Sequence, residues 1–224
     1  MIIKDRLDEY LEFDSDLLFE KPIDLCRIFG GAIRDIIANM PINDIDILCA
    51  SKSNKILENI LKQNGYSYMD SIVGKDIIDI YRGNRVINEP KTFIKGNKIV
   101  QVIRPSSYEK GLSPEKSFRF LIQNVDISCC GVSYDGNLYQ NYPCAISDCL
   151  LKTFTVNKSS LMYNSNRINS RKYKLMDRGW KFIEKKDEIR EKRIEGILNS
   201  QKIDYIDDYV YLKDYLNTKR VSYK

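Results

Sequence analysis

Two adjacent glycines followed by an Asp-x-Asp triplet, all within residues 29–48, constrain this 224-residue chain more than any other feature. The apolar run over residues 25–29 is typical of a short strand, which Gly30 and Gly31 end. Glycine permits positive φ and a close approach of the backbone to a ligand. Residues 32–40 then space their apolar side chains at helical intervals. We therefore predict a strand, a glycine turn and a helix whose first N–H groups favour a phosphate.

Asp44 and Asp46 alternate with Ile45 and Ile47, which is the pattern of a strand. Alternate residues of a strand share a face, so both carboxylates point the same way. Adjacent carboxylates repel each other unless a cation lies between them, and Mg²⁺ typically takes one or two carboxylates together with phosphate oxygens. Two such ions can hold the attacking and leaving oxygens of a phosphoryl displacement. We predict two Mg²⁺ ions here, replaceable by Mn²⁺, and a nucleoside triphosphate as ligand.

These residues resemble the DNA polymerase beta superfamily of nucleotidyltransferases. More narrowly, they are similar to the class II head shared by CCA-adding tRNA nucleotidyltransferases and bacterial poly(A) polymerases. The first family motif, Gly-Gly-x-x-Arg-Asp and then Asp-x-Asp, is matched by Gly30, Gly31, Arg34, Asp35, Asp44 and Asp46. The second, roughly RRDFTINALAYD, is matched by residues 126–135. Weaker matches are residues 139–148 and a segment that includes Arg167, Arg171 and the run 178–180. The resemblance covers about residues 25 to 182.

The resemblance implies a role for each matched residue. Asp44 and Asp46 would bind the metals, and Asp126 would be a third catalytic acid near the attacking hydroxyl. The nucleotide-binding residues would be Gly30, Gly31, Arg34, Arg167 and Arg171. The implied fold is α+β, a small mixed nucleotidyltransferase sheet flanked by helices and followed by a short helical C-terminal region. Residues 1–150 would form the catalytic head and residues 151–224 a basic, neck-like helical region.

The chain departs from the family pattern at several positions. Asn124 and Val125 replace the double arginine of the second motif, and Cys130 replaces its asparagine, for which the sequence offers no physical reason. Tyr163 and Asn164 replace the Glu-Asp pair that is implied to read the incoming base. The resemblance therefore does not extend to the choice of nucleotide. Because 224 residues leave no room for the long helical body and tail of full-length members, we do not expect those parts in this chain.

Charge is divided unevenly along the chain. Residues 151–224 carry 18 Lys+Arg and 10 Asp+Glu, which is +8, whereas residues 1–150 carry 18 and 21, which is −3; the two add up to the net +5. A basic segment of this density is typical of contact with a phosphate backbone. Lys172, Lys174 and Arg178 lie close to aromatic residues, as in single-strand binders, so we predict that they bind RNA. The alternative is a solvated helix face.

Residue types that are absent exclude other chemistry. The chain has no histidine and no Cys-x-x-Cys pair, which argues against zinc and excludes histidine-based acid–base catalysis. Its 6 cysteines lie mostly in apolar contexts, so we expect reduced thiols and a cytoplasmic protein. No apolar run is long enough for a transmembrane helix, and the N-terminus lacks the layout of a signal peptide.

Periodicity and turn residues predict the remaining elements. Residues 126–134 read as a strand with one face against the Asp-x-Asp strand, and residues 66–104 as strands that include a hairpin turning at Gly96. From residue 159 onward the pattern is mostly helical. The other predicted helices span residues 3–20, 54–63, 114–123 and 204–216.

The sequence thus predicts a metal-dependent, template-independent nucleotidyltransferase. It would transfer an NMP from an NTP to an acceptor hydroxyl, with tRNA or another RNA 3′ end as the first candidate. One alternative is NMP transfer to a protein or a small molecule, as in toxin-like members of the superfamily. Another is an RNA- or nucleotide-binding module without turnover. The nucleotide, the acceptor, the number of additions and the oligomeric state stay open.

Overall fold

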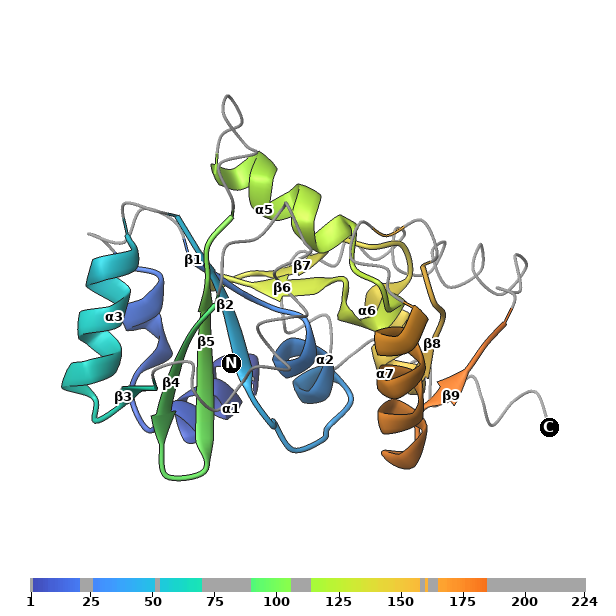
Figure 1. Ribbon diagram of the computed structural model, residues 1–224, viewed down its shortest axis with the longest axis horizontal. Helices are drawn as coiled ribbons and strands as arrows, with labels where there is room; N and C mark the ends of the chain where they lie inside the picture. The colour runs from blue at the N-terminus through green and yellow to red at the C-terminus, as the bar shows by residue number, and fades with distance from the viewer. Residues whose placement is uncertain are drawn as a thin grey trace.

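A computed structural model describes residues 2–20, 26–50, 53–69, 90–105, 114–157, 160 and 165–184. The strands of this part form a mixed seven-stranded sheet in the order β3-β4-β5-β2-β1-β6-β7 and a second sheet of β8 and β9 (Figure 1). β2 and β5 are parallel, whereas β1 is antiparallel to both β2 and β6. The predicted α+β class with a small mixed sheet is confirmed.

The strands are short. They are β1 (Cys26–Phe29), β2 (Ile45–Cys49), β3 (Ser67–Met69), β4 (Lys91–Lys95), β5 (Lys98–Ile103), β6 (Val132–Tyr134), β7 (Leu138–Gln140), β8 (Thr153–Phe154) and β9 (Lys181–Phe182). The α-helices are α1 (Ile2–Leu11), α2 (Gly31–Ile37), α3 (Asn54–Gln63), α5 (Pro114–Gln123), α6 (Ala145–Leu151) and α7 (Ser165–Asp177). Two 3₁₀ turns, η1 (Ser15–Leu18) and η4 (Ser128–Cys130), complete the described part.

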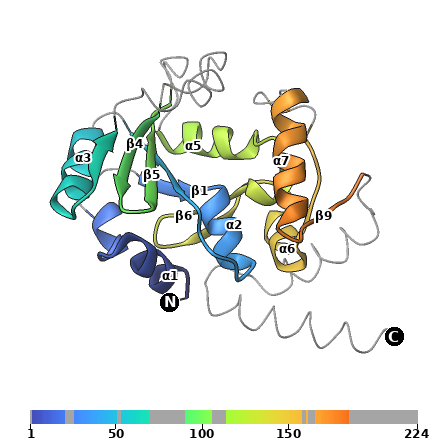
Figure 2. The same ribbon diagram turned by 60° about the horizontal axis from the view of Figure 1, so that its bottom comes forward.

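Alternating side chains of the central strands build a core on each face of the sheet. Ile28 and Ile47 join the larger core, which also contains apolar side chains of α1 and α2. Phe29 and Leu48 point the other way and pack against Phe118, Leu121 and Ile122 of α5. Figures 1 and 2 show α1 and α2 on the side of the sheet opposite α5. β1 and β2 are buried on both faces, so their backbones are fixed. The candidate site residues lie at the end of β1 and at the start of β2.

The helix α7 packs on the same core as the sheet. Ile168 and Leu175 of α7, and Trp180 just after it, are 3–4% exposed and belong to the larger core. Figure 2 shows α7 beside α6 and close to α2. The division into a head at 1–150 and a neck at 151–224 stays a prediction; its boundary falls at the end of α6.

The predicted strand over residues 126–134 is wrong in its first half. Residues 128–130 form the 3₁₀ turn η4, Ile127 makes only an isolated bridge to Val156, and β6 begins at Val132. The hydroxyl of Ser128 donates to Asp148 Oδ2 (2.5 Å) and accepts the N–H of Thr155 (2.9 Å). These bonds curl the chain where alternation alone suggests an extended strand, because a serine side chain competes for backbone groups.

The predicted N-terminal helix over residues 3–20 is interrupted. α1 ends at Leu11, Glu12 takes a φ of 60°, and η1 follows with the Asp14 side chain accepting the N–H of Asp16 (3.1 Å). Three other predictions are confirmed: the helices over residues 54–63 and 114–123, and the hairpin of β4 and β5.

Other predictions lie outside the described residues. Among them are the helix over residues 204–216 and the part of the predicted strands that falls within residues 70–89. Among the helices that the structure describes, none is long and apolar enough to cross a bilayer. The six cysteines are all buried, as predicted, and none forms a disulfide in the structure.

Gly131, which follows η4, is predicted to be intolerant of a side chain. A Cβ at this position would lie 2.1 Å from Cβ of Tyr142 and 3.1 Å from its backbone. We expect Gly131→Ala to lower the free energy of unfolding by about 1–3 kcal/mol, the usual cost of overpacking. Urea denaturation measures it.

The matched control is Gly31→Ala, whose Cβ would meet its nearest atom, Nη2 of Arg34, at an ordinary 3.6 Å. Equal stability of the two variants would contradict the tight packing of residues 131 and 142.

Candidate active site

The turn between β1 and α2 is built around Gly30. Its φ of 73° and ψ of −126° form a conformation that side chains disfavour. The Gly30 N–H donates to the carbonyl of Val132 (3.0 Å), and the Gly30 carbonyl accepts the N–H of Arg34 (3.0 Å). These bonds attach the turn to β6 and start α2 at Gly31, so the predicted strand, turn and helix are confirmed.

Asp44 and Asp46 lie at the start of β2, the neighbour of β1. Asp46 is within the strand, and Asp44 immediately precedes it. The hydroxyl of Tyr10 donates to the carbonyl of Asn43 (2.8 Å) and accepts the N–H of Ile99 (2.9 Å). These two hydrogen bonds to one hydroxyl hold the segment that carries Asp44 next to β5.

Asp46 is in an environment that opposes its charge. Its Oδ1 atom is buried and has no hydrogen-bond partner among the described residues. Burial raises the pKa of Asp46 to about 7, and the carboxylate of Asp44 adds to this, while the charges of Arg171 and Arg167 act in the opposite direction. A carboxyl with one buried oxygen and a like charge beside it favours a cation, which would remove both penalties.

Asp126 joins the site from the segment between α5 and η4. It is 1% exposed, and its Oδ1 accepts a hydrogen bond from Nη1 of Arg171. Its Oδ2 is buried without a partner among the described residues. Asp126 and Asp46 therefore each keep one buried oxygen unsatisfied, and Arg171 acts electrostatically on both. Native structures rarely leave such atoms unpaired unless water, an ion or a ligand uses them.

A chain of ion pairs and hydrogen bonds to sulfur connects Asp126 to α2. Nη2 of Arg171 lies 3.7 Å from Sγ of Cys130, and Nη1 of Arg34 lies 3.4 Å from the same sulfur. Nε and Nη2 of Arg34 both lie 2.8 Å from Oδ1 of Asp35. Asp35 is 1% exposed, and its Oδ2 accepts both Nη groups of Arg178 (3.1 Å each). The chain runs from η4 through α2 to the end of α7.

Arg34 is nearly covered, which limits how it can meet a ligand. Its side chain is 9% exposed, and the guanidinium carbon lies 5.4 Å from the ring centre of Trp180. Of the residues predicted to bind nucleotide, Arg167 and Arg171 are more accessible, with 31% of the Arg171 side chain exposed. Contact of the two glycines and three arginines with a triphosphate stays a prediction.

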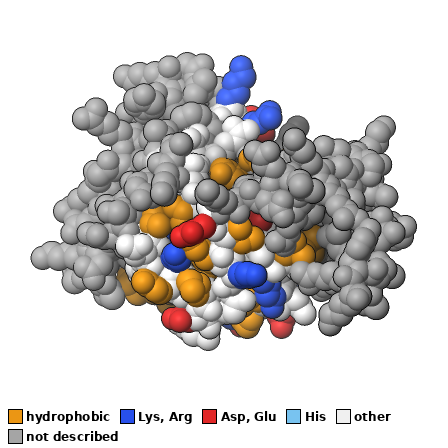
Figure 3. Space-filling model, turned by 90° about the vertical axis from the view of Figure 1, so that its right-hand side faces the viewer, with side chains coloured by type: hydrophobic (Ala, Val, Ile, Leu, Met, Phe, Trp, Pro, Cys, Tyr) orange, Lys and Arg blue, Asp and Glu red, His pale blue; other side chains and the backbone are white. Residues whose placement is uncertain are grey.

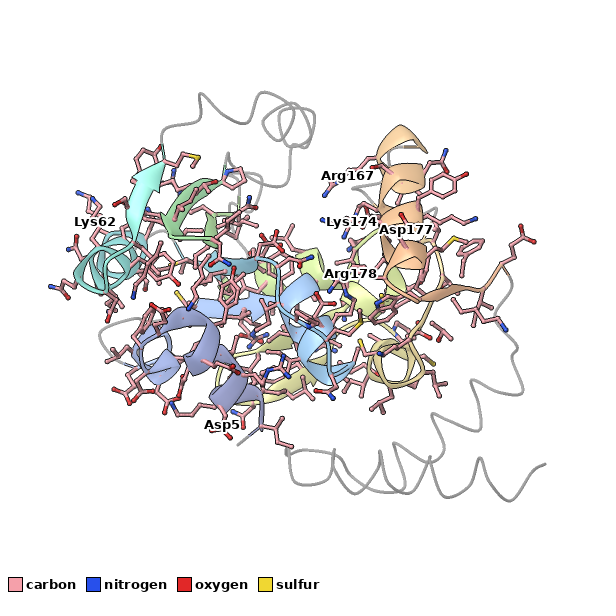
Figure 4. The ribbon with its side chains drawn as sticks, turned by 90° about the horizontal axis from the view of Figure 1, so that it is seen from below. Asp5, Lys62, Arg167, Lys174, Asp177 and Arg178 are labelled. Carbon is pink, nitrogen blue, oxygen red and sulfur yellow. The ribbon has the colours of Figure 1, made fainter. Side chains whose placement is uncertain are left out.

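The residues predicted to bind RNA differ in their surroundings. Figure 4 shows Arg167 and Lys174 of α7, and Arg178 just after it, on the side that is turned toward α2 and the strands. Arg178 is held by Asp35 and by the carbonyl of Pro41 (3.1 Å), whereas Lys174 is exposed. Nζ of Lys172 lies 3.6 Å from the ring centre of Phe182.

The surface beside α7 mixes apolar and basic groups. Tyr173 is 64% exposed and Met176 is 44% exposed on this helix. In Figure 3, which views this side of the molecule, Lys and Arg side chains are interspersed with hydrophobic ones. Exposed aromatics among cations suit stacking of unpaired bases.

Sequence reasoning missed three residues of the site. Asp35 was noted only as part of a motif, yet it joins Arg34 to Arg178. Cys130 had no assigned purpose, and it contacts two arginines. Asp148 fixes η4 through Ser128. The signal for Cys130 was its position in the second motif, because a sulfur replaces an amide there.

The oxygen ligands that the site offers suit a hard cation that takes only a few of its ligands from the protein. Asp44 and Asp46 supply carboxylate oxygens, and the unpartnered Oδ1 of Asp46 is available to such an ion. Within the described ranges, no three His, Cys, Asp or Glu side chains converge closely enough to hold a metal by themselves. The two carboxylates of Asp44 and Asp46 suit Mg²⁺, which usually takes one or two carboxylates and completes its shell with water and substrate phosphates.

Known proteins resemble this chain in fold and not in sequence. No protein-family model matches it, and no curated protein matches its sequence. A CCA-adding enzyme solved with ATP superposes with a TM-score of 0.56 at 13% identity, over 82% of this chain and 42% of the other. The structure with CTP gives 0.54 at 12% identity, over 89% and 46%. A tRNA-processing enzyme complex gives 0.51 at 14% identity, over 90% and 51%.

The chain thus spans about half the length of these neighbours, between 42% and 51%. At this identity the similarity shows the fold alone. It is the α+β fold that the sequence resemblance implied, a mixed sheet flanked by helices.

We predict that Asp46→Asn stabilises the metal-free protein in a pH-dependent way. Because the folded pKa of Asp46, about 7, lies above its ordinary value of 3.8, the folded state holds a proton that the unfolded chain has released between these limits. The contribution of the Asp46 carboxyl to the free energy of unfolding is therefore fully present below pH 4 and is lost as pH rises through 7.

Thermal unfolding in a chelator measures this effect. We expect Asp46→Asn to match the wild type near pH 4 and to melt higher at pH 8. A difference that stays constant across this range would contradict the raised pKa.

Proposed function

We propose that this protein is a metal-dependent, template-independent nucleotidyltransferase. The observation that carries the proposal is the pair of unpartnered buried oxygens, Oδ1 of Asp46 and Oδ2 of Asp126, with Arg171 beside both. Carboxylates that share one guanidinium, bonded to Asp126 and acting electrostatically on Asp46, are suited to a ligand that is both anionic and metal-bound, such as a nucleoside triphosphate. The fold is compatible with this, since the neighbours in fold include enzymes solved with ATP and CTP.

Asp44 and Asp46 would hold the divalent ions, two Mg²⁺ in the proposal, with Mn²⁺ as a substitute. When bound, such ions neutralise charge that develops on the phosphoryl group and on its leaving oxygens. The ionised form of Asp46 is then the favoured one, because the cation offsets its burial and the repulsion from Asp44.

The remaining residues of the site would position the reactants. Arg167 and Arg171 on α7 would receive the triphosphate, and the backbone of the turn at Gly30 and Gly31 would lie against it. Oδ2 of Asp126 would accept a hydrogen bond from the acceptor hydroxyl and keep it aligned for attack on the α-phosphorus. Holding the two reactants in register is a large part of the rate enhancement available to such a site.

The acceptor that the surface favours is an RNA 3′ end. Lys172, Lys174 and the exposed Tyr173 lie on one helix, next to the arginines that would bind the nucleotide. A neighbour in fold is a tRNA-processing enzyme, so tRNA or a tRNA-like end is the first candidate. Arg178 would contribute indirectly, because its guanidinium is bonded to Asp35. A cytoplasmic location is part of the same proposal.

The function is tested by incubating the purified protein with Mg²⁺, each α-labelled NTP in turn and total RNA. We expect label in a discrete RNA band, which identifies the nucleotide. Asp44→Ala and Asp46→Ala are each expected to reduce this labelling by at least about 100-fold, as for a lost electrostatic stabiliser of the reaction.

The matched control is Asp5→Ala, an exposed carboxylate on α1 that lies far from α7 in Figure 4. It should label RNA like the wild type. Label in protein or in small molecules instead of RNA would show that the acceptor is not RNA. Tight Mg²⁺-dependent NTP binding without any product would favour a binding module, and unchanged labelling by Asp44→Ala would overturn the metal assignment.

A further inference from the structure

The sulfur of Cys130 lies between two guanidinium groups. Its Sγ is 3.4 Å from Nη1 of Arg34 and 3.7 Å from Nη2 of Arg171, and the residue is 2% exposed. The two arginines come from different elements, α2 and α7. Cys130 therefore links the two helices at the point where the candidate nucleotide site is built.

Among the charged groups bonded into one chain through Cys130, guanidinium groups outnumber carboxylates. The connected chain holds three guanidinium groups, those of Arg34, Arg171 and Arg178, and two carboxylates, those of Asp35 and Asp126. An uncompensated charge in a mostly buried network is costly. A thiolate at Cys130 would equalise the charges of this bonded chain, outside which Asp46 also interacts electrostatically with Arg171.

The environment of the thiol favours that ionised form. A hydrogen bond from the Cys129 side chain lowers the pKa of Cys130 to about 6, and Arg34 and Arg171 act in the same direction. Burial and the carboxylate of Asp126 oppose the shift. Neighbouring cations commonly activate cysteine thiolates in this way.

We propose that Cys130 is a positioning residue whose sulfur holds Arg34 and Arg171 as a fixed pair beside Asp46 and Asp126. Arg171 keeps 31% of its side chain exposed, although one Nη group is held by Asp126 and the other by Cys130. Its guanidinium is thereby presented to the site without freedom to swing away. The consequence for ligand binding rests on the proposed function, since the positioned arginines would receive the triphosphate.

The link itself is tested without any activity. Urea unfolding is measured for the wild type, Cys130→Ser, Arg171→Gln and the double variant. Serine keeps the size and does not ionise, so we expect the double effect on the unfolding equilibrium to differ from the product of the single effects by about 3-fold or more, the usual range for residues in contact.

Cys26→Ser combined with Arg171→Gln is the control cycle, because Cys26 is equally buried on β1 and bonds to Cys49 instead. In this control, the effect of the double variant on the unfolding equilibrium should equal the product of the two single effects. Equal behaviour of the two cycles would overturn the proposal. If Cys130→Ser fails to fold, Cys130→Asn, the residue of the family motif, replaces it in the same cycle.

The consequence for the site is tested by the KM for the NTP and by kcat. We expect Cys130→Ser to raise KM by about 10-fold and to change kcat by less than about 3-fold, as when ground-state binding is lost. Cys26→Ser should change neither. A KM of the wild-type value in a folded Cys130→Ser enzyme would overturn the positioning of the nucleotide arginines.

The two proposals fail in different ways. A wild-type protein that transfers no nucleotide to any acceptor would contradict the proposed function, and the coupling of Cys130 to Arg171 would then be decided by the unfolding cycle alone. If the wild type transfers nucleotide but the effects of Cys130→Ser and Arg171→Gln on unfolding are independent, the proposed function stands and the positioning role of Cys130 is overturned.

Discussion

The ion pair between Asp126 and Arg171 is the contact on which the rest of the site depends. It joins α7 to the segment that follows α5, and these two pieces lie 45 residues apart in the sequence. Without it, Asp126 would be a buried charge with no partner in the described structure, and Arg171 would lose its position near Asp46. Breaking a buried pair from one side is generally more damaging than replacing both partners.

Apolar burial and the ionic network secure the same geometry by different means. Ile168, Leu175 and Trp180 seat α7 on the core that also supports β1 and β2. Packing fixes the distance of the helix from the sheet, and the chain of guanidinium groups and anions fixes its rotation. A helix that presents cations to a pair of aspartates needs both constraints, because a rotation of one residue would turn those cations to solvent.

Much of the fold followed from local signals in the sequence. The glycine turn, the Asp-x-Asp strand and the hairpin at Gly96 each depend on short-range rules of backbone conformation and alternation, and each is present. The strand over residues 126–134 failed because Ser128 bonds to Asp148 and Thr155, which are distant in sequence. Alternating residues cannot reveal such contacts.

The candidate site was predictable only in part for the same reason. Asp44, Asp46 and Asp126 could be named from motifs, whereas the partners of Arg178 and Cys130 depend on how α7 packs against α2. The sequence predicts that Lys172, Lys174 and Arg178 bind RNA, with a solvated helix face as the alternative. In the structure these cations differ, because Arg178 is bonded to a buried aspartate and Lys174 is exposed.

The central claim is that the unpartnered oxygen of Asp46 belongs to a site for a metal-bound triphosphate. The most direct test is a crystal of the wild-type protein grown with Mn²⁺ and a non-hydrolysable NTP analogue, with the metal located by its anomalous scattering. The account predicts manganese coordinated by Asp44 and Asp46, with the triphosphate next to Arg171. Manganese and nucleotide bound elsewhere, with both aspartates left without a cation, would contradict it.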